Sequence, residues 1–143
     1  MTVKAILAAK GTDVIAIEPN ATVSDAAKLM AERRIGAVLV LGTELRIVGI
    51  ISERDIVRAL GERGAAVLDE PLNRVMTRKV ATCNQSETIR VIMERMTAGR
   101  FRHIPVVERG KLKGVVSIGD AVKYRLGELE QESTALQEYI QRA

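Results

Sequence analysis

The feature that most constrains the fold is an internal repeat that fills most of the chain. At a shift of 66 residues, Val14, Thr22, Met30, Arg34 and Val40 match Val80, Thr88, Met96, Arg100 and Val106. After one deleted residue the shift is 65, and Gly49, Ser52, Asp55 and Val57 match Gly114, Ser117, Asp120 and Val122. A unit of fewer than about 50 residues rarely buries enough apolar surface to fold alone. We therefore expect two similar units that pack face to face about a pseudo-two-fold axis, with ligand crevices at their interface.

The composition supports one compact body with an aliphatic core. Of the 143 residues, 47% are hydrophobic, but the aromatic residues are only Phe101, Tyr124 and Tyr139. The chain therefore lacks the stacking platforms with which many proteins hold single-stranded nucleic acid. Its net charge of +4 suits a small anionic ligand, and it is too weak and too evenly spread to favour nucleic acid.

The sequence predicts neither a disulfide framework nor a membrane span. Cys83 is the single cysteine, which excludes an internal disulfide and a cysteine-rich metal site. The start of the chain has no signal pattern, and no stretch reaches the ~18 apolar residues of a membrane span. We expect a soluble, cytoplasmic protein that holds no metal and contacts no membrane.

The spacing of apolar residues predicts the same order of elements in both repeats. Before its first repeat the chain has a helix over 3–10. The first repeat has a strand over 14–17, a helix capped by Thr22 with Asp25, strands over 37–41 and 47–51, and a helix from Ser52 to about Leu60. The second has a strand over 80–83, a helix after Thr88, strands over 104–107 and 112–116, and a helix from Ser117. Each unit is thus β-α-β-β-α, and the fold class is α+β.

These boundaries divide the chain into four parts. Residues 1–66 hold the N-terminal helix and the first unit, 67–79 form a linker, 80–126 form the second unit, and 127–143 extend its last helix. Along this helix, apolar residues and one serine alternate steps of four and three, a heptad-like seam that favours a partner helix. The seam consists of Val122, Leu126, Leu129, Ser133, Leu136 and Ile140. Pairing with a second copy and docking on the chain's own domain are both open interpretations.

A strand-to-helix junction that occurs twice carries the sharpest local signal. The segments GIISERD over 49–55 and GVVSIGD over 114–120 share glycine, two β-branched residues, serine and, three positions later, aspartate. One interpretation is a capping box, in which Ser and Asp satisfy each other's backbone N–H groups. The other is a binding site, because a helix N-terminus attracts phosphate and a carboxylate beside it can accept both hydroxyls of a ribose. The two are compatible, since one Ser/Asp pair can serve both purposes.

A second constellation precedes the hairpin of the second repeat. Arg100, Arg102 and His103 lie just ahead of Ile104 and Pro105. Taken singly, Arg100 fits a solvated helix end, and a lone histidine is more often structural than a ligand. Their place in the repeat, where the first unit has residues 36–37, favours a phosphate site near the second helix start.

The motifs of catalysis are missing from the sequence. GKLKG over 110–114 lacks the Ser or Thr that follows a P-loop lysine, and no GxGxxG follows a predicted strand. The single histidine and the single cysteine have no evident orienting third group. We predict a binding protein and not an enzyme.

Together these motifs resemble a tandem pair of CBS domains (cystathionine β-synthase type), also called a Bateman module. The resemblance rests on the doubled Gly–aliphatic–aliphatic–Ser–x–x–Asp junction, on RHIPVV over 102–107 and on VMT over 75–77, and it covers about 11–126. The family implies binding of AMP, ADP, ATP, NAD or S-adenosylmethionine in clefts between the two units. It also implies frequent pairing into a flat dimer of four units.

The resemblance assigns roles residue by residue. The ribose-binding residues would be Asp120, Asp55, Ser117 and Ser52. The phosphate-binding residues would be Arg102, His103, Arg54 and Arg100. The adenine pocket would contain Thr12, Asp13, Val14, Thr82, Ile104 and Pro105, with 12–14 serving the cleft of Asp120 and Thr82 serving the cleft of Asp55.

The two halves also differ, which predicts unequal clefts. Arg102 and His103 replace Gly36 and Ala37 of the first unit, whereas Arg54 has a glycine as its counterpart in the second junction. We expect the second-repeat carboxylate to belong to the better phosphate site. The first-repeat site should depend on Arg54 or bind weakly.

The leading hypothesis is an energy-sensing regulatory module that binds AMP, ATP or NAD(H) and acts in trans on a partner protein, as a homodimer. The alternative is a protein-interaction module without a ligand, whose Ser/Asp junctions act only as helix caps. Nucleic-acid binding, which would show a steep salt dependence, is the weakest of the three.

Overall fold

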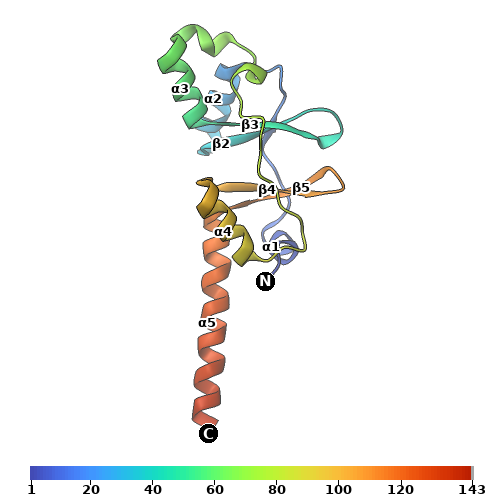
Figure 1. Ribbon diagram of the computed structural model, residues 1–143, viewed down its shortest axis with the longest axis vertical. Coiled ribbons are helices and arrows are strands. Elements are labelled where there is room, and N and C mark those ends of the chain that lie inside the picture. Colours follow the sequence, from blue (N-terminus) through green and yellow to red (C-terminus); the bar gives the residue numbers. More distant parts are fainter. Residues whose placement is uncertain (143) are drawn as a thin grey trace. The chain divides into compact units, whose positions relative to one another are not determined.

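The computed structural model describes residues 1–142, which form two compact units (Figure 1). Unit 1 comprises Met1–Asp13, Thr82–Glu108 and the chain from Lys113 onward. Unit 2 comprises Val14–Ala81 and Arg109–Leu112. Each unit has a hydrophobic core of its own.

Unit 2 contains the first repeat, folded as a three-stranded sheet with two helices. The strands are β1 (Ala16–Ile17), β2 (Ala37–Leu41) and β3 (Ile47–Ser52), in that order in the sheet, and the helices are α2 (Val23–Arg33) and α3 (Glu53–Arg63). β1 runs parallel to β2 and β2 antiparallel to β3. This fits the chain order, because α2 forms the crossover that a parallel pair requires and a tight turn suffices for the antiparallel pair. Three short 3-10 helices complete the unit, η1 (Thr43–Leu45), η2 (Ala65–Asp69) and η3 (Leu72–Arg74).

The sequence around Thr22 explains how α2 begins. Asp25 N donates to Thr22 Oγ1 at 3.1 Å, and Thr22 N donates to the Asp25 carboxylate at 3.0 Å. The predicted cap is therefore confirmed as a reciprocal capping box. The apolar face of α2 then enters an aliphatic core. That core consists of Val23, Ala26, Met30, Val38, Val40, Ile51, Ile56, Leu72 and Met76.

Unit 1 contains the second repeat together with the N-terminal helix. Its helices are α1 (Val3–Lys10), α4 (Ile89–Gly99) and α5 (Ile118–Arg142). The strands β4 (His103–Glu108) and β5 (Lys111–Ser117) form a two-stranded sheet, of which the turn and the start of β5, Arg109–Leu112, are grouped with unit 2. The turn of this hairpin places Arg109 and Gly110 at positive φ, 52° and 77°, as a tight hairpin turn demands. The core of unit 1 consists of Val3, Ile6, Leu7, Cys83, Ile89, Ile92, Met96, Ile104, Val106, Val116 and Ala121.

Helix α1 belongs with the second repeat and not with the first. Its Val3, Ile6 and Leu7 are buried in the core of unit 1. Backbone bonds also hold this end of the chain, from Val3 N to Glu87 O at 2.9 Å and from Lys4 N to Gln85 O at 3.0 Å. Grouping by contact therefore differs from the division expected along the sequence, where 1–66 form one part.

Two other segments differ from their sequence-based descriptions. The strand predicted over 80–83 is reduced to a single bridge between Cys83 and Val106, while β1 has only two residues. The predicted linker, 67–79, contains the end of η2 and all of η3, and it buries Leu72 and Met76 in the core of unit 2. It is therefore part of that unit's packing.

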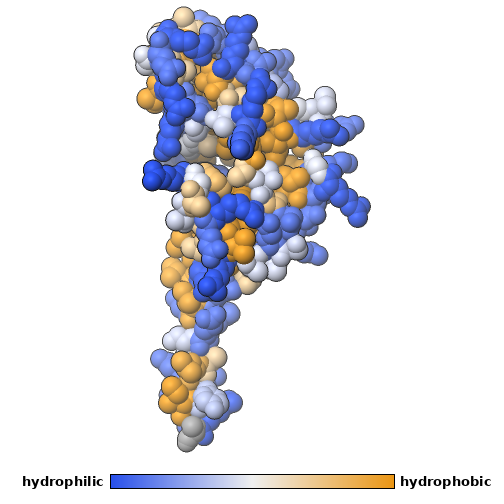
Figure 2. All heavy atoms as spheres, viewed as in Figure 1, coloured by the Kyte–Doolittle hydropathy of each residue, from blue (hydrophilic) through white to orange (hydrophobic). Residues whose placement is uncertain are grey.

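Helix α5 continues well past the second repeat. Ala121 is its one buried residue, and every side chain over 129–142 is exposed. The apolar members of the predicted seam, from Val122 to Ile140, are between 40% and 63% exposed. Orange apolar side chains accordingly recur along this helix in Figure 2. The interpretation in which the seam docks on the chain's own domain is therefore wrong. Among residues 1–142, no helix is both long and apolar enough to cross a membrane.

Candidate functional site

The two Ser/Asp junctions form the starts of α3 and α5, and both act as caps. In the first, Asp55 N donates to Ser52 Oγ at 3.2 Å and Ser52 N donates to Asp55 Oδ2 at 3.0 Å. In the second, the corresponding distances between Asp120 and Ser117 are both 3.0 Å. The capping interpretation is confirmed in both repeats. Each carboxylate is thereby held in one orientation at a helix N-terminus, where the helix dipole favours negative charge.

The glycine that opens each junction allows another segment to approach the strand. A Cβ on Gly49 would lie 2.9 Å from the carbonyl oxygen of Thr77 and 2.7 Å from Met76 Sδ. A Cβ on Gly114 would lie 2.8 Å from Leu7 Cδ2. In both cases the approaching segment precedes the first strand position of a repeat, since 76–77 precede that of the second repeat and α1 precedes that of the first. Each segment also carries a polar side chain, Thr77 or Lys10, that contacts the aspartate.

The aspartates differ in the third partner that these segments supply. Thr77 Oγ1 donates to Asp55 Oδ1 at 3.1 Å, and Ser52 Oγ contacts Asp55 Oδ2 at 3.1 Å. Asp120 instead has a cation, because Lys10 Nζ lies 2.5 Å from its Oδ2. The same ammonium donates to the carbonyl oxygen of Val115 at 2.7 Å.

The environment of Asp120 favours its ionised form. Partial burial raises the pKa of this carboxyl, but the hydrogen bonds from Lys10 and Ser117 outweigh burial and hold the pKa below its usual range. Within residues 1–142, no hydrogen bond reaches Asp120 Oδ1. One oxygen therefore carries the cap and the ion pair, and the other accepts from no donor among residues 1–142.

Arg102 and His103 lie at the same helix start. The carbonyl of Arg102 accepts from Ile118 N at 2.7 Å, which ties the residue before β4 to the first turn of α5. His103 opens β4 and is partly buried. Burial lowers the pKa of His103, nearby Lys10 and Arg102 lower it further, and Asp120 opposes the shift. The structure thus gathers Lys10, Arg102, His103, Ser117 and Asp120 in one place, which we call the Asp120 site.

The other two predicted phosphate residues lie in different settings. Arg54 is exposed on the first turn of α3, beside Asp55 in the sequence. Arg100 is the left-handed cap of α4, with φ 56°, and its N–H donates to Met96 O. Arg34 is the corresponding cap of α2, with φ 55°, so the structure gives Arg100 a role in ending a helix.

The predicted adenine residues have mixed surroundings. Thr12 and Asp13 are exposed, and Val14 is half-buried. The side chain of Ile104 is fully buried in the core of unit 1, and Pro105 accepts from Cys83 N through its carbonyl, at 2.9 Å. Ile104 therefore supports this region from within.

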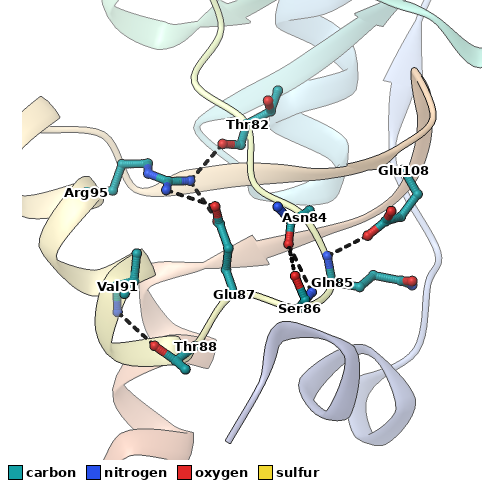
Figure 3. Close-up of polar contacts among 9 residues, drawn as sticks. All are labelled: Thr82, Asn84, Gln85, Ser86, Glu87, Thr88, Val91, Arg95 and Glu108. Carbon is teal, nitrogen blue, oxygen red and sulfur yellow. Dashed lines mark hydrogen bonds and ion pairs between the residues drawn. The ribbon is translucent and has the colours of Figure 1, made fainter.

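Thr82 is exposed, and its backbone is fixed by an arginine (Figure 3). Arg95 Nη1 donates to Thr82 O at 2.9 Å, and the same guanidinium binds both carboxylate oxygens of Glu87 at 2.9 and 3.1 Å. This bidentate pair stiffens the loop over 82–87, which Asn84 further closes by accepting from Ser86.

Two residues of the sites, Lys10 and Thr77, were absent from the sequence-based prediction. Both precede the first strand position of a repeat, and VMT over 75–77 was noted only as part of the resemblance. The repeat alignment was the available signal, because it places Lys10 opposite Met76, next to Thr77. No group of three or more His, Cys, Asp or Glu side chains that could hold a metal ion occurs within 1–142. A hollow of about 570 Å³ lies elsewhere, between α4 and α5, and Met93, Thr97 and Arg125 are among its lining residues.

Comparison with known proteins decides the family. The family model described as "CBS domain" matches twice, over residues 3–62 and 72–127. The chain belongs to the CBS domain family. The chain spans between 21% and 67% of the length of eight curated relatives that it matches.

Solved CBS proteins share the fold. A CBS-domain containing protein from Agrobacterium tumefaciens is 42% identical, with a TM-score of 0.82 over 87% of this chain and 99% of that one. A CBS domain protein from Pyrobaculum aerophilum, complexed with AMP, is 28% identical, with a TM-score of 0.73 over 84% and 89%. The CBS domain pair of protein MJ0100, in complex with 5′-methylthioadenosine and S-adenosyl-L-methionine, is 25% identical, with a TM-score of 0.76 over 90% and 98%. A pair of CBS domains in an α+β fold is thereby confirmed.

Proposed function

We propose that this chain is a regulatory module that binds an adenosine ligand, AMP, ATP or NAD(H), at the Asp120 site. The observation that carries the proposal is the charge arrangement at the start of α5, where one fixed carboxylate lies among Lys10, Arg102 and His103. A carboxylate in this position can accept both hydroxyls of a ribose. The cations and the helix N-terminus can hold a phosphate.

The chemistry of the relatives' ligands supports this choice. AMP, 5′-methylthioadenosine and S-adenosylmethionine share an adenosine moiety, and a ribose diol is the part that a carboxylate recognises. Binding would shift the module between conformations according to its affinity for each. We propose that a partner protein reads this shift in trans, that the role is energy sensing and not catalysis, and that the location is cytoplasmic.

The two carboxylates should not bind equally. Asp55 is surrounded by the neutral hydroxyls of Ser52 and Thr77, so its phosphate contact would have to come from Arg54. The Asp120 site instead contains two cations, Lys10 and Arg102. We therefore propose that the Asp120 site binds the nucleotide more tightly.

Isothermal titration of the protein with AMP, ATP and NAD tests the proposal. Asp120→Ala should weaken binding about 10- to 100-fold, because a hydrogen bond to a charged group contributes about 1.5–3 kcal/mol. Asp55→Ala is the matched control, since it removes the same group from an equivalent cap. It should leave the tighter binding event nearly unchanged.

Two results would contradict this assignment. Unchanged affinity in Asp120→Ala, at an unchanged melting temperature, would remove Asp120 from the site. If no nucleotide raises the melting temperature of the wild type, and Asp120→Ala only costs about 1 kcal/mol of stability, the junctions are caps alone. The protein would then be the interaction module of the alternative hypothesis.

We propose further that the protein is a homodimer joined through the second half of α5. Every residue over 129–142 is exposed, and Leu129, Leu136 and Ile140 form an apolar stripe there. An isolated helical segment as short as 129–142 is only marginally stable in water. Alternating steps of four and three are the spacing with which two such helices pack in a coiled coil.

Charge favours the parallel arrangement of two copies. In register, Arg125 would lie at a g position facing Glu130 of the partner subunit at an e position, an attractive pair. The antiparallel register that aligns the apolar residues would instead oppose Glu130 to Glu130 of the partner subunit, and likewise Glu132, which is repulsive.

Sedimentation equilibrium tests the dimer. Leu136→Glu should convert the dimer to a monomer because it places a charge in the seam. Gln131→Glu adds the same charge on the outer face of α5 and should leave the dimer intact. A monomeric wild type would refute the proposal, and failure of Leu136→Cys to crosslink with its own copy would refute the parallel order.

A further inference from the structure

The proposed function counts Lys10 among the cations of the Asp120 site, but it does not explain the ion pair that this lysine forms with the aspartate. Lys10 lies in the last turn of α1, before Gly11, and reaches across to the start of α5. Its ammonium contacts Asp120 Oδ2 at 2.5 Å and Val115 O at 2.7 Å. The side chains of Lys10 and Asp120 are 28% and 24% exposed, so the pair is partly shielded from water and from salt screening.

This ion pair competes with a ribose for the same carboxylate. A diol that binds Asp120 with both hydroxyls needs Oδ1 and Oδ2, and Oδ2 already accepts from Lys10 and from Ser117 N. The cap can remain, because the backbone of Ser117 is fixed. Lys10 can move, because its ammonium sits on a flexible four-carbon stem.

A lysine displaced from Asp120 would need another anion. A neutral adenosine supplies none, so binding it would leave the ammonium without a counter-charge beside Arg102 and His103. A 5′-phosphate supplies one, and it would find Lys10 within reach of the same helix start. Loss of the Lys10–Asp120 ion pair is therefore compensated only when the ligand carries a phosphate that can pair with Lys10.

We propose that Lys10 makes the Asp120 site selective for 5′-phosphorylated adenosine ligands over adenosine itself. The inference rests on the proposed function and names the residue that sets its ligand class. Selectivity is the difference between the affinities for the phosphorylated and the unphosphorylated ligand. The Lys10–Asp120 ion pair weakens binding of adenosine because it must be broken without replacement, whereas Lys10 strengthens binding of a phosphorylated ligand because it pairs with the phosphate. Asp55 has Thr77 in this place, so the first-repeat site should lack the device.

Titration of Lys10→Met with AMP and with adenosine tests the inference. Methionine keeps most of the stem's volume and removes the charge. AMP should bind about tenfold more weakly than to the wild type, as expected for loss of one charge-assisted bond. Adenosine should bind equally well or more tightly, so the ratio of the two affinities falls. Lys10→Arg should restore the preference for AMP.

Lys4→Met is the matched control, because it removes a lysine from the exposed face of the same helix. It should leave both affinities unchanged. Equal weakening of AMP and adenosine in Lys10→Met, or no change in either, would overturn the inference while the loss of binding in Asp120→Ala still upheld the proposed function. A wild type that binds neither ligand would overturn both.

Discussion

Among single residues, the two junction glycines have the most direct structural role. Gly49 admits the backbone at Thr77, and Gly114 admits the side chain of Leu7. The segments admitted in this way bring Thr77 to Asp55 and Lys10 to Asp120. A glycine at the same repeat position therefore allows two chemically different neighbours for the aspartate, a neutral hydroxyl beside Asp55 and an ammonium beside Asp120.

The glycines should differ in their tolerance of alanine. Gly49→Ala forces a Cβ against a carbonyl oxygen that is fixed by the backbone bonds between Ile50 and Thr77, so it should lower the free energy of unfolding by about 1–3 kcal/mol. Gly114→Ala meets only the end of the Leu7 side chain, which can shift. We expect a smaller loss, below about 1 kcal/mol. Urea unfolding of both variants measures the difference, and an equal cost would contradict this explanation.

His103 predicts a pH dependence of stability. It is the chain's single histidine, and its pKa in the folded protein is lowered by burial and by Lys10 and Arg102. The unfolded chain therefore binds a proton more readily, so stability should increase from pH 5 to pH 7. The difference in unfolding free energy between wild type and His103→Gln, measured across this range, isolates the effect. A constant difference would show that His103 does not titrate as described.

At the scale of elements, local sequence predicts the caps and the hairpins well. The caps predicted at Thr22, Ser52 and Ser117 all accept the bond expected of them. Each is specified by a few adjacent residues, which is why spacing alone could find it. The extent of the strand over 80–83 could not be predicted from local spacing, because its pairing depends on residues distant in the sequence, such as Val106.

Contacts between distant residues explain why the Asp120 site was predicted only in part. Lys10 and Asp120 are 110 positions apart, and nothing local to either one indicates the other. Their meeting depends on α1 packing on the second repeat, against the order of the sequence. Arg100, by contrast, was placed at the site by position, and the structure shows it ending α4.

Helix α1 should stabilise unit 1 more than unit 2. Ile6 is completely buried in the core that α4 and β4 share. Ile6→Ala should cost about 2–5 kcal/mol because it leaves a cavity. This substitution should accelerate backbone hydrogen exchange more in α4 and β4 than in α2 and β2. Equal acceleration in both sets of elements would contradict the assignment of α1 to unit 1.

At the scale of the whole molecule, the two repeats keep one architecture and differ in charge. The shared caps, hairpins and left-handed helix ends at Arg34 and Arg100 follow the repeat. The cations do not, since Lys10, Arg102 and His103 all lie in unit 1. The duplicated fold thus carries one cluster of cations beside an aspartate, and the unequal binding predicted from the sequence stays a prediction.

The thiol of Cys83 offers a reporter of global opening. It is buried in the core of unit 1, and burial raises its pKa to about 12, with Glu87 adding to the shift. A buried thiol that resists ionisation is a poor nucleophile, so iodoacetamide should label the native protein very slowly at pH 8. Under the proposed function, AMP at saturating concentration should slow labelling further by stabilising the folded state. Rapid labelling of the native protein would contradict this burial.

The packing of α1 has a practical consequence for anyone who wishes to dissect this molecule. If the chain is cut between the repeats, at the boundary that the sequence suggests, α1 stays on the N-terminal fragment, although it packs on the second repeat. The C-terminal fragment would lose the apolar cover of its core together with the ammonium beside Asp120. The C-terminal fragment alone would therefore not represent unit 1, and adding the N-terminal fragment should return α1 to that core.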